Sequence, residues 1–113
     1  MSKSRPEPQA TLLGSLEEQV MLAVVRTGVD AYGMSVRREL EDVTGRDVTI
    51  GSVYATLDRL EAKGLVTSSR TAGSDALSRR IFAVTAAGTR ALAHTRAVRD
   101  RLWSGVRLQN SGS

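Results

Sequence analysis

The sequence predicts a mostly α chain with one two-stranded β hairpin, an α+β fold, and three observations support this prediction. Three segments in the first part of the chain carry apolar residues at helical spacing and are bounded by capping residues or glycine. Two short β-type runs then flank a loop of small residues, which is typical of a hairpin. A long segment with an apolar stripe follows. At 113 residues, with 41% hydrophobic and 25% charged residues, the chain has the size and composition of one globular domain.

The first periodic segment runs from about Ser15 to Thr27 and stops at Gly28, so we expect a helix there. Ser15 is the expected N-cap, and the carboxylates of Glu17 and Glu18 suit the positive end of the helix dipole. Apolar residues lie on several faces, which predicts burial on more than one side. A short buried strand is the alternative interpretation, which the length of the segment and its glutamate pair disfavour.

The second and third helices are expected on either side of a polar turn. Asp30 is the predicted cap of a short amphipathic helix that continues to about Val43 and ends at Gly45. Thr49 is the predicted cap of a third helix that stops at Gly64. Steps of 100° per residue place the core arc of this third helix on Ile50, Val53, Tyr54, Leu57 and Leu60.

The opposite arc of the third helix is small, polar and cationic. It consists of Ser52, Ala55, Thr56, Arg59 and Lys63, with Asp58 to the side and Glu61 at the edge of the apolar arc. A solvated surface is one interpretation of this arc. A DNA-reading helix has the same pattern, because small residues allow close approach, hydroxyls contact bases or phosphates, and Arg and Lys bind phosphate or guanine.

A hairpin is expected next, from strands Leu65–Arg70 and Ile81–Thr85 joined by the loop Thr71–Ser78. Arg79 and Arg80 bring two guanidiniums to the second strand, beside the one that ends the first. These cations are either solubilising charges on a sheet edge or groups that bind phosphate, and their place next to the third helix favours phosphate.

Thr85 is the predicted cap of a last helix from Ala86 to about Val106, roughly 31 Å long at 1.5 Å per residue. Arg99 intrudes on its apolar stripe, which consists of Ala87, Ala91, Leu92, Val98, Leu102, Trp103 and Val106. Packing on the first helix of the same chain is one way to cover this stripe. Because one short helix is too small to cover all of it, the sequence favours a homodimer joined through the first and last helices.

Charge is unevenly distributed along the chain. The net charge is +4 and the isoelectric point is about 10.3. From Arg46 to Arg107 there are 11 basic and 5 acidic residues, whereas residues 1–45 hold 5 basic and 7 acidic residues. A basic segment of this kind is typical of a protein that binds a polyanion.

Several classes of function are disfavoured. Without cysteine there is no disulfide framework, thiolate metal site or cysteine nucleophile, and a reducing compartment fits. No apolar run is long enough for a membrane span, so we expect a cytoplasmic protein without a membrane partner. The single His94 has no carboxylate one helical turn away to orient it, and no phosphate loop, nucleophile motif or metal-spaced cluster is present. We therefore expect no catalytic residue, no metal and no cofactor.

The order helix, helix, turn, helix, hairpin, helix is that of a winged helix-turn-helix with an added dimerisation helix. Over about Leu12 to Val106 the chain resembles the short members of the PadR family of bacterial transcriptional regulators. The residues that carry this resemblance are Leu13–Gly14, Tyr32–Gly33, Thr85 with Gly88, and above all Gly51, Ser52, Val53, Tyr54, Leu57, Leu60, Gly64, Leu65 and Val66. Two features depart from the family pattern: Ile81 and Phe82 replace an aromatic pair, and Tyr32–Gly33 reverses the commoner order.

The resemblance implies a dimeric, usually repressive regulator that binds double-stranded DNA at a pseudo-palindromic operator and is sometimes released by a small aromatic effector. The expected division is a disordered tail at 1–11, a DNA-binding domain at 12–85, a dimerisation helix at 86–108 and a disordered tail at 109–113. A winged-helix module for protein contacts and a regulator of another winged-helix family are the alternatives.

Three sets of site residues follow from these arguments. The expected DNA contacts are Thr49, Ser52, Tyr54, Thr56, Arg59, Lys63, Arg70, Arg79 and Arg80. The expected dimer contacts are Leu16, Val20, Leu92, Val98, Leu102, Trp103 and Val106. A stacked effector is expected at Trp103 and Arg99.

Overall fold

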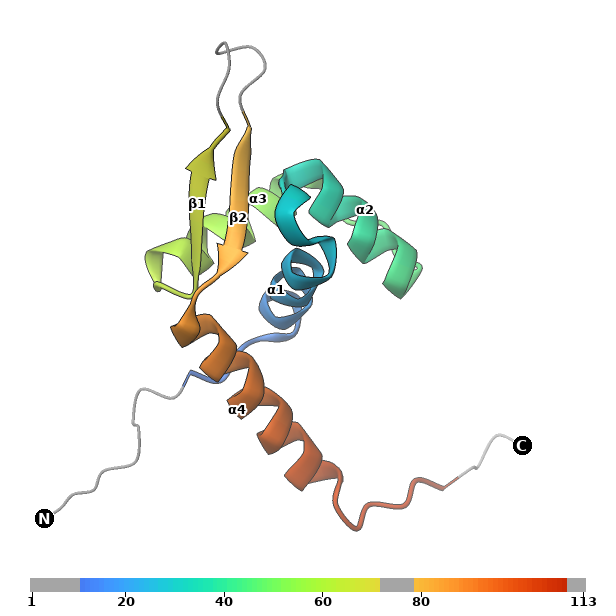
Figure 1. Ribbon diagram of the computed structural model, residues 1–113. Coiled ribbons are helices and arrows are strands. Elements are labelled where there is room, and N and C mark those ends of the chain that lie inside the picture. Colours follow the sequence, from blue (N-terminus) through green and yellow to red (C-terminus); the bar gives the residue numbers. More distant parts are fainter. Residues whose placement is uncertain (1–10, 72–78, 110–113) are drawn as a thin grey trace, which may run out of the picture.

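The computed structural model describes residues 11–71 and 79–109 (Figure 1). Its elements are α1 (Ser15–Thr27), a 3₁₀ turn (Gly28–Asp30), α2 (Gly33–Thr44), α3 (Ile50–Ala62), β1 (Val66–Arg70), β2 (Arg80–Val84) and α4 (Ala86–Trp103). The predicted fold class is therefore confirmed. Apart from Thr11 and Gln109, the tails predicted to be disordered lie outside the described residues, as does the hairpin loop at 72–78.

The core lies where α1, α2 and α3 meet the hairpin. Helix α1 is its centre, with Val20 and Met21 fully buried and Ala23 and Val24 almost so. Burial on more than one side of α1 is thus confirmed. The hairpin closes the core with Phe82, which is 1% exposed and whose backbone N–H donates to the carbonyl of residue 31 at 2.8 Å.

The hairpin, which we call the wing, is antiparallel, with register from Val66 opposite Val84 to Arg70 opposite Arg80. Both strand ranges agree with the prediction within one residue at each end. At its base the Thr85 hydroxyl accepts from the N–H of Gly88 at 3.0 Å, which confirms the predicted cap of α4.

Two helix starts differ from the prediction. Gly14, not Ser15, is the N-cap of α1, because the Glu17 carboxylate turns back to accept from the Gly14 N–H at 3.0 Å. Tyr32, not Asp30, is the N-cap of α2, and residues 28–30 form the 3₁₀ turn instead. A long-range contact explains this second difference, since the carbonyl of residue 31 is bound by the wing and cannot begin a helix.

Helix α4 is shorter than predicted. It ends at Trp103, and Gly105 adopts a left-handed conformation with φ +76°, so Val106 lies beyond the helix. Helix α4 packs on the body of the domain through the buried Ala91 and Thr95, and the Thr95 hydroxyl accepts from the Leu13 N–H at 3.0 Å. Beyond Arg99, the end of α4 extends away from the other helices (Figure 1). No helix among the described residues is long and apolar enough to cross a membrane.

The junction between α4 and the wing requires glycine at position 88. A Cβ built on Gly88 lies 2.1 Å from the carbonyl oxygen of Leu65 and 2.7 Å from Val84 Cγ1. We expect Gly88→Ala to reduce the free energy of unfolding by about 1–3 kcal/mol, because the backbone must shift to relieve this clash. Urea denaturation at a fixed protein concentration measures the change.

Gly51→Ala is the matched control, since Gly51 is also helical but faces open space in the described structure. It should stabilise the protein by roughly 0.5–1 kcal/mol through helix propensity. Equal effects of the two substitutions would contradict the close approach at Gly88.

Candidate nucleic-acid interface

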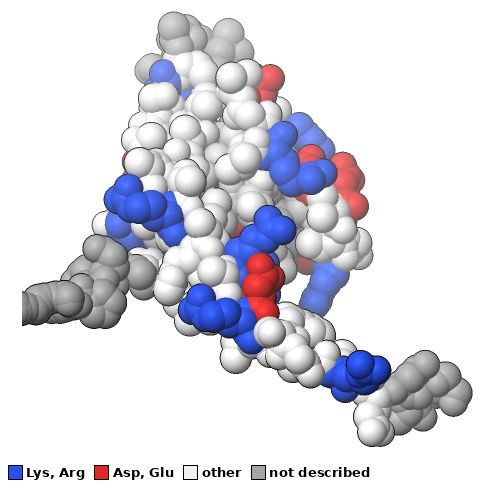
Figure 2. All heavy atoms as spheres, turned by 60° about the horizontal axis from the view of Figure 1, so that its bottom comes forward, with Lys and Arg blue, Asp and Glu red and all other residues white. Residues whose placement is uncertain are grey.

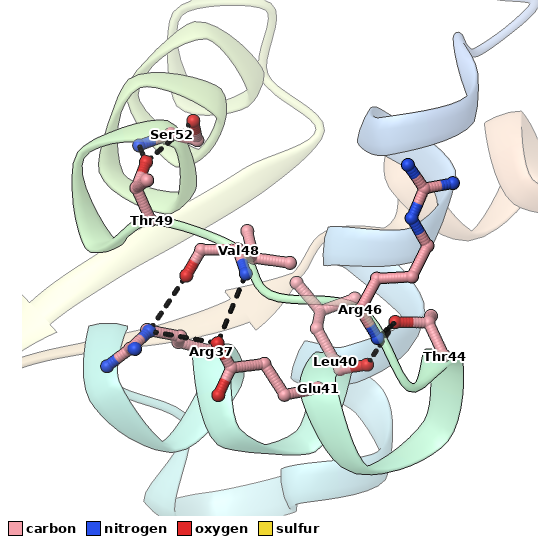
Figure 3. Close-up of polar contacts among 8 residues, drawn as sticks. All are labelled: Arg37, Leu40, Glu41, Thr44, Arg46, Val48, Thr49 and Ser52. Carbon is pink, nitrogen blue, oxygen red and sulfur yellow. Dashed lines mark hydrogen bonds and ion pairs between the residues drawn. The ribbon is translucent and has the colours of Figure 1, made fainter.

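A network of polar contacts fixes the turn between α2 and α3 (Figure 3). Arg37 Nε donates to the carbonyl of Val48 at 2.8 Å, and the Val48 N–H donates to Glu41 Oε2 at 3.1 Å. The two side chains are also paired with each other at 3.4 Å. At the start of α3 the Thr49 hydroxyl accepts from the Ser52 N–H at 3.0 Å, which confirms the predicted cap. The turn therefore holds α3 at a set angle to α2.

The outward face of α3 is rotated from the predicted one. At 100° per residue, four exposed residues lie on the side of α3 opposite its buried residues. We name these residues the recognition face: Gly51, Ala55, Asp58 and Ala62. Thr56 is 1% exposed, so its predicted place on the outward arc is wrong, and it packs in the core with a 3.5 Å hydrogen bond from Arg59. Thr56 is not a candidate DNA contact.

One flank of the recognition face is formed by the N-terminus of α3. Here Thr49 and Ser52 are exposed, and the Thr49 hydroxyl lies 2.9 Å from the Ser52 hydroxyl. They border a hollow of about 330 Å³ that is also lined by Arg46 and Gln19. Sequence reasoning missed Arg46, which follows the glycine that ends α2. The hydroxyls and the Arg46 guanidinium suit an anionic ligand, although the lining also includes the acidic Asp47.

The other flank faces the wing across a hollow of about 560 Å³ whose lining includes Tyr32, Tyr54, Arg70 and Arg79. The guanidinium of Arg79 stacks on the Tyr32 ring at 4.1 Å. Tyr54, 37% exposed, lies so close to α2 that a Cβ on Gly33 would be 2.3 Å from its ring. Tyr54 thus lies at the edge of the core arc predicted for it, and its predicted contact with DNA stays a prediction.

Tyr32 and Arg38 also belong to this flank, although sequence reasoning gave neither a role in the site. Arg38 Nη2 donates to the Tyr32 hydroxyl at 3.3 Å. This hydrogen bond, together with the positive charge of Arg79, lowers the pKa of Tyr32 from its ordinary value. Tyr32 belongs to the Tyr32–Gly33 pair that carries part of the family resemblance. Its contact with Arg79 joins residues 47 positions apart, so local spacing does not predict it.

Three predicted DNA-binding cations are paired with carboxylates. Lys63 Nζ lies 2.8 Å from Glu17 Oε2, and Arg59 Nε lies 3.6 Å from the same oxygen. Arg80 is paired with Asp58 at 3.1 Å and Glu61 at 2.9 Å. These cations are thus engaged within the protein, although the Arg59 side chain remains 52% exposed.

The predicted dimer residues fall into two groups. Val20 is fully buried within the protomer, so its predicted place in the interface is wrong, and Leu16 and Leu92 pack partly against the same core. Leu102, Trp103 and Val106 are 72%, 55% and 49% exposed, and Val98 is partly exposed. On the side where α4 lies, Figure 2 shows broad uncharged surface with separated charged groups.

Arg99 is engaged by α1. Its Nη1 lies 2.6 Å from Glu18 Oε1, and this carboxylate raises the pKa of Arg99. Arg99 is thus paired within the protomer, and its predicted contact with an effector stays a prediction. Within residues 11–71 and 79–109, no three side chains of His, Asp or Glu gather as a possible metal site.

The elements and the two-flanked recognition face define a winged helix-turn-helix protein. The model of the transcriptional regulator PadR-like family matches residues 21–94, and the chain belongs to this family. Its members are transcriptional regulators, so the chain is a regulator and not an enzyme. A comparison with curated proteins gives no significant match.

Solved structures agree with this assignment. A complex of RosR from H. salinarum, described as hsRosR-S4, is 26% identical and superposes with a TM-score of 0.66 over 87% of this chain and 80% of the other. A PadR family regulator from Eggerthella lenta is 26% identical, with a TM-score of 0.62 over 80% of each chain. A PadR-like transcription factor from Bacteroides fragilis, 22% identical with a TM-score of 0.69 over 79% of this chain and 84% of the other, shows the shared fold.

The ion pairs of Glu17 predict a pH effect on stability. The hydrogen bond from Lys63 lowers the pKa of Glu17 from 4.5, and Arg59 and the Gly14 N–H act in the same direction. A lowered pKa in the folded state stabilises the protein above pH 4.5, and this contribution is lost as the pH falls through the lowered value. We expect Glu17→Gln to be less stable than the wild type at pH 6, with the difference shrinking at pH values below the lowered pKa.

Urea denaturation at several pH values measures this difference. Glu39→Gln is a matched control, because it removes a carboxylate that pairs with one arginine, Arg26, between α1 and α2. A stability difference between Glu17→Gln and the wild type that is the same at all pH values would contradict the linkage.

Proposed function

We propose that this regulator binds double-stranded DNA in a sequence-specific manner, with α3 in the major groove and the wing against the phosphate backbone. The observation that carries the proposal is the recognition face itself. Gly51 and Ala55 leave its first turns without bulk, and groups that suit phosphate lie on both sides. A helix face of this form can enter the major groove, where the groups on its two sides lie beside the phosphates of the two strands.

Each flank has a distinct part in this proposal. Thr49 and Ser52 supply hydroxyls beside the helix N-terminus, where base edges and the nearest phosphates lie. Arg79, held in place by the Tyr32 ring, supplies the cation of the wing side. Arg59 is exposed enough to leave Glu17 and reach a guanine or a phosphate.

A winged-helix module that contacts only proteins remains the rival function. Such a module requires neither the stacked Arg79 nor a recognition face of small residues. Its affinity for a partner would not show the steep salt dependence of duplex DNA binding. As part of this proposal, residues 12–85 form the DNA-binding unit and residues 86–108 form the dimerisation segment.

Substitution of Arg79 tests the backbone contact. Arg79→Ala should weaken binding to all duplexes by similar factors and lower the slope of log affinity against log salt by roughly one unit, because one phosphate contact is lost. Fluorescence anisotropy with labelled duplexes at several salt concentrations measures both quantities. Arg90→Ala, which removes an exposed arginine from α4, is the control and should keep the wild-type slope. Equal slopes for Arg79→Ala and the wild type would remove Arg79 from the interface.

We also propose that the protein is a homodimer in which a second copy covers the end of α4. Leu102, Trp103 and Leu108 are more than half exposed, and Val106 is nearly so. Leu22 and Val25 on α1 are exposed as well, so apolar surface is present on both helices predicted to form the interface. Exposed apolar surface of this kind is typical of an association surface. Two copies would place two recognition faces on half-sites about 34 Å apart, one turn of DNA.

Leu102→Asp tests the dimer. Two carboxylates would be brought into an apolar interface without partners, which costs several kcal/mol. Sedimentation velocity at micromolar concentration should show a dimeric wild type and a folded, monomeric variant. Thr89→Asp introduces the same carboxylate at an exposed position on α4 and should leave the dimer intact. A monomeric wild type would refute the proposal.

Repression of transcription, release by a small aromatic effector and a cytoplasmic location remain predictions from the family resemblance and the composition. For the effector, the half-exposed Trp103 is the residue that still supports the prediction, since Arg99 is paired with Glu18. The exposure of Trp103 in a single protomer also fits a packing role, in which a second copy buries this side chain in the dimer.

A further inference from the structure

Arg80 is held by three neighbours on the wing side of α3: Asp58, Glu61 and Phe82. Its Nη2 lies 3.1 Å from Asp58 Oδ1 and 2.9 Å from Glu61 Oε1. Its guanidinium stacks on the buried Phe82 ring at 4.8 Å. The other oxygen of Glu61 accepts from the Ser68 hydroxyl of β1 at 2.8 Å, so the carboxylate itself is also fixed. With 30% of its side chain exposed, Arg80 is oriented toward α3 and not toward open solvent.

Asp58 presents an electrostatic problem for DNA binding. It is the charged member of the recognition face, its side chain is 61% exposed, and it lines the hollow between α3 and the wing. A bare carboxylate at this position would face the phosphates of any duplex that α3 approaches, and juxtaposed like charges oppose association. Glu61, one turn further along α3 at the edge of the same flank, adds to this repulsion.

We propose that Arg80 is a positioning residue that neutralises Asp58 and Glu61, so that the recognition face can approach DNA, and that it does not itself bind phosphate. The proposal deepens the proposed DNA-binding function and rests on it. The two neighbouring wing arginines then have different roles. Arg79, stacked on Tyr32, contacts the DNA backbone, whereas Arg80 neutralises carboxylates of α3. Both of its ion pairs join β2 to α3, so Arg80 also sets the position of the wing relative to the helix.

A double-mutant cycle tests this assignment. The probe is a labelled mixed-sequence duplex of about 30 base pairs, long enough for two half-sites one turn apart. Arg80→Met should weaken binding by about tenfold, because it exposes two carboxylates to the phosphates. Asp58→Asn should change affinity little when Arg80 is present and should restore most of the lost affinity in the Arg80→Met background. If Arg80 binds phosphate instead, Asp58→Asn will have the same effect in both backgrounds, and the proposal fails.

The salt dependence gives an independent readout. The Arg80→Met/Asp58→Asn variant should keep the wild-type slope of log affinity against log salt, since no phosphate contact has been removed. A slope lower by roughly one unit in this double variant would assign Arg80 to the backbone and overturn the proposal.

A variant that retains Arg80 guards against a folding defect in Arg80→Met. Asp58→Asn/Glu61→Gln releases Arg80 from both carboxylates while leaving its contact with Phe82 in place. The freed guanidinium should then reach phosphate, so affinity and salt slope should both rise, the slope by roughly one unit. An unchanged slope would contradict the proposal. If the wild type itself shows no salt-dependent affinity for duplex DNA, the proposed function fails and the role of Arg80 fails with it.

Discussion

The packing of α3 against the rest of the core is the constraint on which the interface depends, because it fixes the rotation of this helix about its own axis. The residues that α3 buries are Val53, Thr56, Leu57 and Leu60. The contacts of Arg37 and Glu41 with the backbone of Val48 then fix the direction from which the helix leaves α2. With rotation and direction both set, the small residues Gly51 and Ala55 face outward together with Asp58, whereas Arg59 and Glu61 lie on the two flanks.

This arrangement explains why most charged residues of α3 form ion pairs with other elements of the same protomer. On the α1 flank, Glu17 holds Lys63 and lies near Arg59, and on the wing flank, Arg80 holds Asp58 and Glu61. Glu18, next to Glu17 in α1, pairs with Arg99 of α4. The first turn of α1 therefore contacts both the helix proposed to meet DNA and the helix proposed to form the dimer. Helix α4 is thus connected to α3 indirectly, through two adjacent glutamates of α1.

Much of the fold could be predicted from the sequence, because local signals specify it. Thr49 and Thr85 lie directly before helical segments and cap them, and the strands agree with the expected ranges. The start of α2 could not be predicted, since a long-range hydrogen bond from Phe82 determines it. The outward position predicted for Thr56 is wrong because its hydroxyl suggests a polar arc, whereas the residue is 1% exposed in the core. The ion pairs of Glu17 with Lys63 and of Arg80 with Asp58 and Glu61 join residues distant in sequence, and no local pattern specifies them.

The central claim is that the outward line of α3 faces DNA, and thiol protection tests it most directly. The chain contains no cysteine, so Ala55→Cys introduces a unique thiol in the middle of the recognition face. Thr89→Cys places a matched exposed thiol on α4. Excess duplex DNA should strongly slow maleimide alkylation of the Ala55→Cys variant and leave the rate for Thr89→Cys unchanged. Equal alkylation rates for Ala55→Cys with and without bound duplex would contradict the account.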